Sequence, residues 1–339
     1  MSTEFAKDQP EGFKNYLKKI AIVGAGGHVG SYIVKELLKT GKHEVIALTR
    51  ADSKSKIADG VTKVVVDYDD ESTVVAALAG VDFLIVTMSV LAPRDLENKI
   101  IAMAAKAGVK YVMPNVFAGD VMNEKLVQEA TFTPGFKPRA KHIEDLGMKW
   151  IALACGFWYE HSVVMGPDWF GFDFKNHVMT FYDDGKTMMT VGTFEICGEA
   201  VAALLSLPVL PKDENDNSVT LSRWFNKPVY VASFRICQKD MFDSILRMSG
   251  EKEEDWKIVY QPSAERYQEA VATMKQGGPL ARVAFARAMY SRMFFPTGEA
   301  DCETMYGLSN EVLGLPEYNL DEHSKNALQM IADHWSYFG

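Results

Sequence analysis

A glycine-rich segment near the N-terminus has residue types and spacing suited to holding the phosphates of a dinucleotide. The segment GAGGHVG follows a short apolar run, KIAIV. The strict GxGxxG template fails because Val29 occupies its last glycine position, whereas a GxxGxxG template fits Gly24, Gly27 and Gly30. Those glycines would permit a tight turn, backbone approach to the pyrophosphate and close helix–strand packing. An ordinary glycine-rich turn is the alternative, but a helix starting near His28, with His28 and Val29 beside the cofactor, favours a dinucleotide site.

The residues after the second apolar run, EVIAL, bear on which dinucleotide binds. An NAD site usually carries an acidic residue there, for the ribose 2′-hydroxyl, whereas Thr49 and Arg50 stand at this point. A guanidinium pairs with phosphate through two hydrogen bonds, so Arg50 favours NADP(H), although Asp52 could instead serve a ribose. Asp67, after the third run, could accept a hydrogen bond from the adenine amino group or could cap the helix that follows.

Later strand ends supply further candidates for the cofactor site. Met88 and Ser89 follow the fourth apolar run, where the chain should pass the cofactor ribose, and Asn115 and Phe117 follow the fifth, near the expected nicotinamide. Asn115 could hydrogen-bond substrate or cofactor and is also a candidate catalytic residue. A plain turn at the end of the strand is the alternative for Asn115.

Aromatic residues cluster after the sixth apolar run, WIALA. Phe157 and its neighbours could form a wall beside the nicotinamide and a flat substrate, and Tyr159 and His161 are candidate acids. Aromatic side chains at such a place serve packing more often than chemistry, so packing is the alternative for both.

These candidates follow apolar runs that alternate with helical patterns, and this alternation determines the expected fold. Short apolar runs joined by helices predict a Rossmann-type, doubly wound parallel α/β sheet, whose ligands bind at the carboxyl ends of the strands. We expect the dinucleotide-binding domain to span residues 18–160, with 190–235 returning to it. The alternation ends after that domain, so 161–189 and 236–339 should form a smaller, mainly C-terminal α+β substrate lobe.

Composition excludes several functional classes. The chain has 339 residues and a net charge of −9, with acidic and basic residues interspersed, which argues against nucleic acid as a partner. Four scattered cysteines suit a reducing compartment, and the absence of HExxH or Cys/His clusters predicts no metal. The sequence lacks a long apolar run and an N-terminal signal-peptide pattern. We therefore expect a cytoplasmic location and no membrane association.

The order of these segments resembles the NmrA-like and isoflavone-reductase-like family of atypical short-chain dehydrogenases/reductases. The matching segments include IVGAGGHVG, ALTR, VVVDYDD, VKYVMPNVFAGD and RAKHIEDLGMKWIALACGFW, and the resemblance covers roughly residues 18–270. It implies a Rossmann domain with a smaller substrate lobe and a nicotinamide in the cleft between them.

The resemblance also implies a role for a lysine on the helix before the sixth strand, which here is Lys141. This lysine would bind the nicotinamide ribose and polarise or protonate the substrate, and a solvated lysine on a helix face is the alternative. One departure from ordinary short-chain dehydrogenases is clear. Their Tyr-x-x-x-Lys motif would need a tyrosine at Lys137, so the standard tyrosine acid is absent.

From these features we expect an NADPH-dependent reductase of a small organic substrate, such as an aromatic or alkaloid-like secondary metabolite. Hydride would pass to a C=C, C=O or C=N bond. One alternative is a non-catalytic NADP-sensing regulator, since some relatives share the glycine turn without turnover. Another is a reductase that also directs cyclisation of its product. The sequence leaves open whether the chain forms a homodimer.

Overall fold

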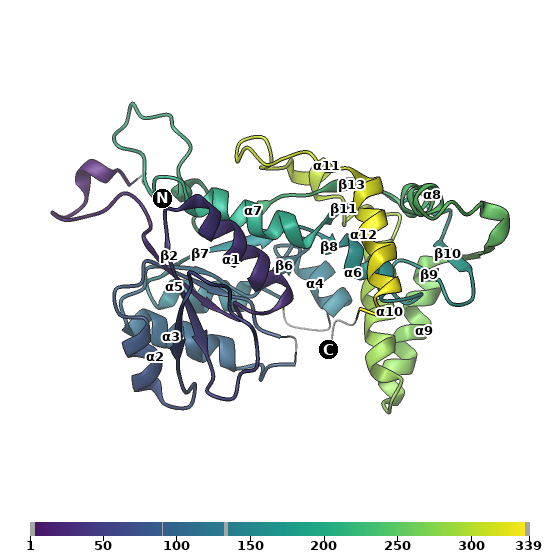
Figure 1. The fold of residues 1–339 in the computed structure, drawn as a ribbon, viewed down its shortest axis with the longest axis horizontal. Coiled ribbons are helices and arrows are strands. Elements are labelled where there is room, and N and C mark those ends of the chain that lie inside the picture. Colours follow the sequence, from purple (N-terminus) through teal and green to yellow (C-terminus); the bar gives the residue numbers. More distant parts are fainter. Residues whose placement is uncertain (1–3, 90, 132–134, 336–339) are drawn as a thin grey trace.

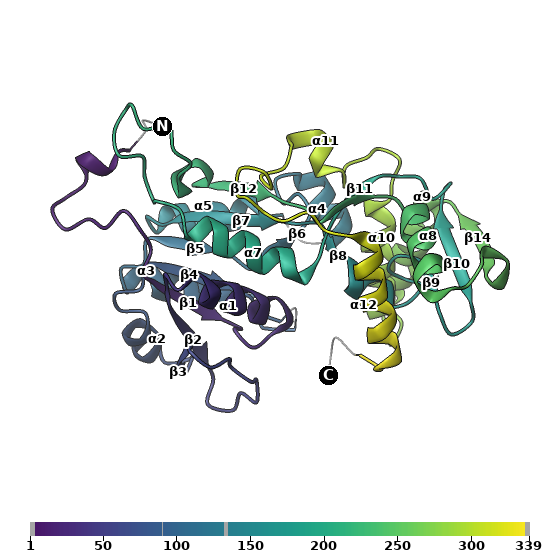
Figure 2. The ribbon, with the colours of Figure 1, turned by 45° about the horizontal axis from the view of Figure 1, so that its top comes forward.

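The computed structural model describes residues 4–89, 91–131 and 135–335, and its largest sheet lies on the left in Figures 1 and 2, with helices on both faces. Every neighbouring pair of strands in this sheet is parallel, which confirms the predicted doubly wound architecture. In spatial order the strands are β12 (Lys227–Tyr230), β7 (Lys149–Ala154), β5 (Tyr111–Met113), β4 (Phe83–Val86), β1 (Lys19–Val23), β2 (Glu44–Thr49) and β3 (Thr62–Val65), with β6 (Phe117–Ala118) also paired to β7.

The apolar runs become central strands because helices cover both faces of the sheet. Ile20 and Ile22 of β1 pack into one core layer, and Ala21 and Val23 into the other, so alternate side chains serve opposite faces. Two helices cover the first face and pack against each other, and three cover the second. The helices on the first face are α1 (His28–Thr40) and α7 (Phe194–Leu205). Those on the second face are α2 (Glu71–Ala77), α3 (Leu96–Lys106) and α5 (Lys137–Asp145).

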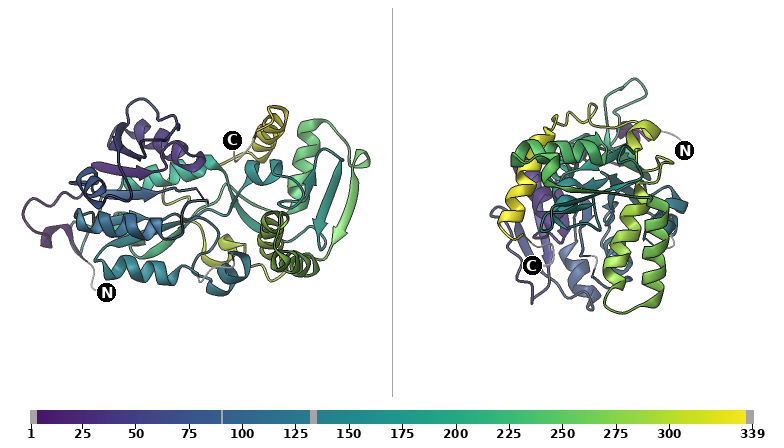
Figure 3. Two further views of the ribbon diagram at one scale, coloured as in Figure 1. Left: turned by 90° about the horizontal axis from the view of Figure 1, so that it is seen from below. Right: turned by 90° about the vertical axis from the view of Figure 1, so that its right-hand side faces the viewer.

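Two three-stranded sheets extend the molecule beyond the carboxyl end of the large sheet (Figure 3). The nearer one joins β11 (Met189–Gly192) to β8 (Phe157–Trp158) and β13 (Phe234–Ile236). The farther one joins β10 (Val178–Tyr182) to β9 (Phe172–Asp173) and β14 (Lys257–Gln261).

Seven helices accompany these sheets within the described residues. They are α4 (Glu124–Thr131), α6 (Tyr159–Val164), α8 (Gln238–Ser249), α9 (Ser263–Gln276), α10 (Ala281–Met293), α11 (Cys302–Tyr306) and α12 (Leu320–Ala332). Short 3-10 turns occupy Ala6–Asp8, Leu221–Trp224 and Glu253–Asp255.

The chain passes more than once between the large sheet and the lobe. After β11 it returns as α7, which packs on α1, and as β12, which pairs with β7 at the edge of the large sheet. It then leaves through β13 for the lobe. Within the part of the chain that the structure describes, no helix is long and apolar enough to cross a bilayer.

Candidate active site

A cavity of about 600 Å³ lies at the carboxyl end of the large sheet, between that sheet and the lobe. One part, called here the glycine end, is formed by residues that follow β1 and β4: Gly27, His28, Val29, Thr87, Met88 and Ser89. The opposite part, called the apolar end, is formed by side chains from α4, α10 and the segments beside them: Leu126, Val127, Phe136, Phe157, Met289 and Met293. Thus one cavity extends from the glycine-rich turn after β1 to a wall of apolar side chains.

At the glycine end, the turn between β1 and α1 can be built only with small residues. Gly24 has φ +83°, and a Cβ added there would lie 2.2 Å from the Thr87 carbonyl oxygen. A Cβ on Gly30 would lie 2.1 Å from the Gly24 carbonyl oxygen. Gly27 stands at the N-cap of α1, which has no side-chain cap and no acidic residue in its first turn. The first N–H groups of α1 therefore face the cavity without a competing side chain or a repelling carboxylate, which fits a bound pyrophosphate.

The residues expected to recognise the adenosine half of the dinucleotide lie at the ends of β2 and β3, outside the cavity lining. Arg50 is exposed, and its Nε lies 3.5 Å from a carboxylate oxygen of Asp52. Burial raises the pKa of Tyr68 to about 12, and the charge of Arg50 opposes this shift. Thr49 is buried. Such an open guanidinium has room for a phosphate.

Asp67 forms a local turn, with its carboxylate accepting the Asp69 N–H at 3.0 Å. The N-cap of α2 is Asp70, whose carboxylate accepts the Ser72 N–H. The alternative role of Asp67 as the helix cap is therefore wrong. Its other role, accepting a hydrogen bond from the adenine amino group, stays a prediction.

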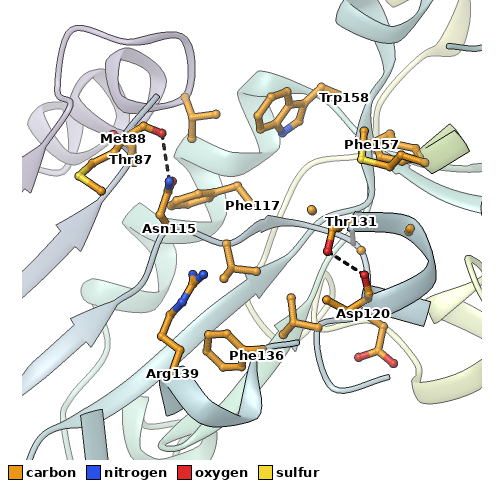
Figure 4. A pocket seen from close by; sticks show the side chains of 18 of the residues that line it. Thr87, Met88, Asn115, Phe117, Asp120, Thr131, Phe136, Arg139, Phe157 and Trp158 are labelled. Carbon is orange, nitrogen blue, oxygen red and sulfur yellow. Dashed lines mark hydrogen bonds between the residues drawn. The ribbon is translucent and has the colours of Figure 1, made fainter. Parts of the chain in front are cut away.

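Asn115 joins the ends of two neighbouring strands beside the cavity (Figure 4). Its side-chain amide donates to the Met88 carbonyl at 3.0 Å, and its backbone N–H donates to Glu97 Oε1 at 2.7 Å. Glu97 is itself buried on α3. Asn115 thereby fixes the chain after β4 against the chain after β5, and Met88, Ser89 and Phe117 line the cavity with it.

Lys141 does not reach this cavity. Its side chain is 73% exposed and forms an ion pair with Asp145, with Nζ 2.7 Å from each carboxylate oxygen. The side chains around α5 that line the cavity are Phe136 and Arg139. Successive helical residues are about 100° apart, so a shift of two positions turns a side chain to the other side of the helix. The geometry therefore corrects the assignment of Lys141 as the group at the nicotinamide.

Tyr159 is also placed away from the cavity. Its side chain is fully buried, and its hydroxyl lies 2.6 Å from the Ser324 hydroxyl of α12. Burial raises the pKa of Tyr159 above its ordinary value. Because α6 turns this ring into the lobe's core, Tyr159 cannot donate a proton at the cavity, and its assignment as a catalytic acid is wrong.

An aromatic cluster lies next to the glycine end and includes a residue from the end of the described chain. The ring of Trp335 lies 5.3 Å from that of His28 and 5.9 Å from that of His161. Phe194 contacts His28, His161 and Trp158 in the same cluster. Burial, and then the nearby His28, lower the pKa of His161 to about 4, so this imidazole is neutral at neutral pH.

The apolar end is held by ring stacking and by ion pairs behind it. Phe157 stacks on Tyr290 of α10, with centroids 3.9 Å apart and planes 12° apart. Arg292, also on α10 and almost fully buried, pairs with Glu129 of α4 and with Glu299, each at 2.6 Å. These contacts fasten α10, with its two cavity methionines, to α4.

Several of the cavity residues were not predicted from the sequence. Asp120 is buried, and its carboxylate accepts hydrogen bonds from the hydroxyls of Tyr230 and Tyr306, both at 2.8 Å. Arg139 and Phe136 also line the cavity and were not predicted. Arg139 stands in the segment RAKHIEDLG that carried the resemblance, so a helical-wheel comparison with Phe136 could have found it. The described residues contain no group of three or more His, Cys, Asp or Glu side chains that could hold a metal ion.

Comparison with known proteins finds similarity to a family model and to proteins named as oxidoreductases and reductases. Residues 17–162 match the NmrA-like family. The chain is 26% identical to "Oxidoreductase aprR" of Aspergillus flavus over 314 residues, covering 90% of this chain and 96% of that protein. It is 29% identical to "Isoflavone reductase homolog A622" of Nicotiana tabacum over 150 residues, which span 41% of this chain and 48% of that protein.

Among solved structures, the fold is similar to that of AtPrR2 with NADP+ and (+)pinoresinol. The TM-score is 0.66 at 16% identity, with 93% of this chain and 100% of that chain covered. This likeness shows a shared fold across both the large sheet and the lobe.

Proposed function

Because the chain belongs to the NmrA-like family through its residues 17–162, we propose that it is an NADPH-dependent reductase of a small organic acceptor. The observation that carries this proposal is the continuity of the cavity. A single space reaches from Gly27, His28 and Val29 at the N-terminus of α1 to Phe157 and Met289 at the apolar end. A reductase must hold cofactor and acceptor in contact, and this cavity offers one surface for each.

The glycine end fits the dinucleotide through backbone groups. Uncapped N–H groups of α1 would hold the pyrophosphate, and Arg50 at the end of β2 would pair with the 2′-phosphate. Met88, Ser89 and Asn115 would border the nicotinamide ribose, because they end β4 and begin the turn after β5. The bound cofactor supplies a hydride, and these residues set where the acceptor can receive it.

The apolar end fits a flat, largely apolar acceptor. Its wall combines the Phe157 ring, held by stacking on Tyr290, with Met289 and Met293, whose flexible side chains adapt to irregular shapes. Such a wall excludes water from the reacting atoms and would select an aromatic or alkaloid-like secondary metabolite over a sugar. The similarity to an isoflavone reductase homolog supports this class of acceptor.

The direct test is NADPH oxidation by the full chain against a panel of aromatic ketones, enones, quinones and cyclic imines. We expect absorbance of NADPH to fall with at least one of them, and NADH to be a poorer donor. The matched variant is Gly30→Val, which should abolish both NADPH binding and turnover because its side chain would collide with the Gly24 carbonyl. A chain that binds NADPH tightly, oxidises none of the panel and captures a protein partner would instead be a non-catalytic regulator.

A further inference from the structure

We propose that Arg139 is the residue that binds the oxygen of the acceptor, which makes the acceptor a carbonyl-type compound rather than an isolated alkene. This inference rests on the proposed reductase function. It assigns to Arg139 the charge-stabilising role that the sequence placed on Lys141.

Arg139 enters the cavity between its two ends. Figure 4 shows its guanidinium beneath Asn115 and beside the ring of Phe136, with both side chains projecting from the start of α5. The guanidinium carbon lies 5.8 Å from the centre of the Phe136 ring. The side chain is 34% exposed, so its end remains accessible to a bound molecule. It therefore lies where a molecule on the apolar wall would approach the strand ends.

An ion pair holds the guanidinium of Arg139 in place and leaves some of its N–H donors available to a ligand. Arg139 Nη1 lies 3.1 Å from Glu97 Oε2, and the other oxygen of Glu97 accepts the Asn115 N–H. Because Glu97 is 7% exposed, this carboxylate is a fixed support for both polar groups. A guanidinium carries several N–H donors in a planar fork, so the ion pair at Nη1 leaves donors for a ligand oxygen.

The charges of the described lining residues single out this side chain. Among the described residues that line the cavity, Asp120 has the only carboxylate, and it accepts hydrogen bonds from Tyr230 and Tyr306. His28 lies at the glycine end, at the first residue of α1. Arg139 is thus the permanent cation that an acceptor at the apolar end can reach. The neighbouring Glu97 balances its charge, which suits an acceptor that is neutral when it binds and becomes charged as it reacts.

The chemistry follows from these positions. A bound NADPH would supply the hydride and become NADP+. When this hydride adds to the carbon of a carbonyl, or to the far carbon of a conjugated enone or quinone, a C–H bond forms and the π electrons move to oxygen. Arg139 would donate N–H hydrogen bonds to that oxygen while the negative charge develops. The guanidinium stays protonated, so the proton that completes the hydroxyl comes from water. An isolated C=C bond would place the charge on carbon, where Arg139 could not bind it.

The test measures anion binding in the cavity separately from turnover. Titration of the NADP+-saturated chain with 2-naphthoate, by calorimetry, probes an aromatic body with one oxyanion. We expect Arg139→Gln to weaken its binding about 10-fold or more, the usual effect of losing a hydrogen bond to a charged group. Arg139→Lys should recover part of the loss. Lys141→Ala, a cation removed from the same helix, should leave the affinity unchanged, and uncharged 2-methylnaphthalene should bind wild type and Arg139→Gln alike.

Three results would overturn the assignment. They are the absence of naphthoate binding by the wild-type chain, equal binding by Arg139→Gln, and a loss confined to NADP+ affinity in Arg139→Gln. The last result would place the guanidinium on the dinucleotide. If NADP+ itself failed to bind the wild-type chain, the proposed function would fail first, and the two failures are therefore distinguishable.

Discussion

The two ends of the cavity are built in different ways. The glycine end consists of turns between buried strands and helices, where backbone N–H groups and the lack of side chains form the surface. The apolar end consists of side chains brought together from α4, α10 and the segments that precede α5 and α6. A surface made of backbone suits a constant ligand, since few substitutions can alter it without breaking the fold. A surface made of side chains can change its ligand while the fold stays intact.

The elements that support the two ends of the cavity also differ. The glycine end sits on β1 and β4, whose side chains are almost completely buried in two core layers. The apolar end rests on helices joined by ion pairs and by a third core layer that lies within the lobe. From this contrast we expect substitutions at the glycine end to affect both folding and cofactor binding. Substitutions at the apolar end should affect acceptor binding with little change in cofactor affinity.

The largest effect is expected for Gly24→Ala. Gly24 and Gly80 both have positive φ, at +83° and +72°, so alanine costs about 1–2 kcal/mol of backbone strain at either site. Only at Gly24 would the new Cβ collide, 2.2 Å from the Thr87 carbonyl, whereas nothing lies within 4 Å at Gly80. Gly24→Ala should therefore lose at least about 3 kcal/mol in the free energy of unfolding, together with NADPH binding. Equal stability losses in the two variants, measured by denaturant titration, would refute a steric role for this turn.

The next effect tests the apolar end through Arg292→Met. This change removes an almost fully buried cation and leaves Glu129 and Glu299 without their shared partner. Because both carboxylates are partly exposed, we expect a loss of about 2 kcal/mol in the free energy of unfolding rather than the larger cost of a fully buried pair. As α10 loosens, acceptor binding should weaken while NADPH affinity stays within about 2-fold.

Lys252→Met is the matched control for the ion pair of Arg292. Lys252 pairs with Glu254 at 3.3 Å, but both side chains are about three-quarters exposed. Its removal should change stability by less than about 0.5 kcal/mol. A parallel loss of NADPH affinity in Arg292→Met would show that the two ends are not separable.

The sequence was sufficient for the glycine end because the causes there are local. One short stretch contains the run KIAIV, the three glycines and the amphipathic helix after them. Each glycine stands where an added Cβ would come close to a backbone oxygen. The alternation of strands and helices likewise predicted the parallel sheet, since crossovers force that arrangement.

The apolar end could not be predicted because its contacts join distant segments. Phe157 stacks on Tyr290, which lies 133 residues later in the chain. The Tyr159 hydroxyl is hydrogen-bonded to that of Ser324, which lies 165 residues later. On α5 the sequence identified the helix but not its rotation. Lys141 and Arg139 are two positions apart, and only packing against the sheet decides which of them reaches the cavity.

A smaller effect is expected for Arg50→Ala, which tests the rim of the glycine end without touching its backbone. Arg50 is exposed and ion-paired only with Asp52 among the salt bridges of the described chain, so its removal should leave stability unchanged. Loss of a guanidinium–phosphate contact should weaken NADPH binding about 10-fold or more, because such a contact contributes about 1.5–3 kcal/mol. NADH lacks the 2′-phosphate and is the internal control. Equal weakening of both dinucleotides, measured by fluorescence titration, would exclude phosphate recognition by Arg50.

The smallest effect concerns the support of the apolar end by α12. His323 of α12 lies 2.5 Å from a carboxylate oxygen of Glu160 on α6, the helix that follows Phe157. Burial lowers the pKa of His323, but the hydrogen bond and charge of Glu160, with Glu195 farther away, outweigh it and hold the pKa above the usual value. The folded chain thus binds this proton more tightly than the unfolded chain does. The resulting stabilisation is complete below about pH 6.5 and is lost as the pH rises through the raised pKa.

His323→Gln should therefore lower the free energy of unfolding by about 1 kcal/mol near pH 6, and by progressively less toward pH 9. Glutamine keeps a donor for Glu160 but not the charge, so the change isolates the proton. His177→Gln is the matched surface control, since His177 faces Glu251 at 3.1 Å with about half of its side chain exposed. A destabilisation of His323→Gln that is the same at every pH, in thermal unfolding curves, would mean that shape rather than charge joins α12 to α6. The apolar end would then depend on packing throughout.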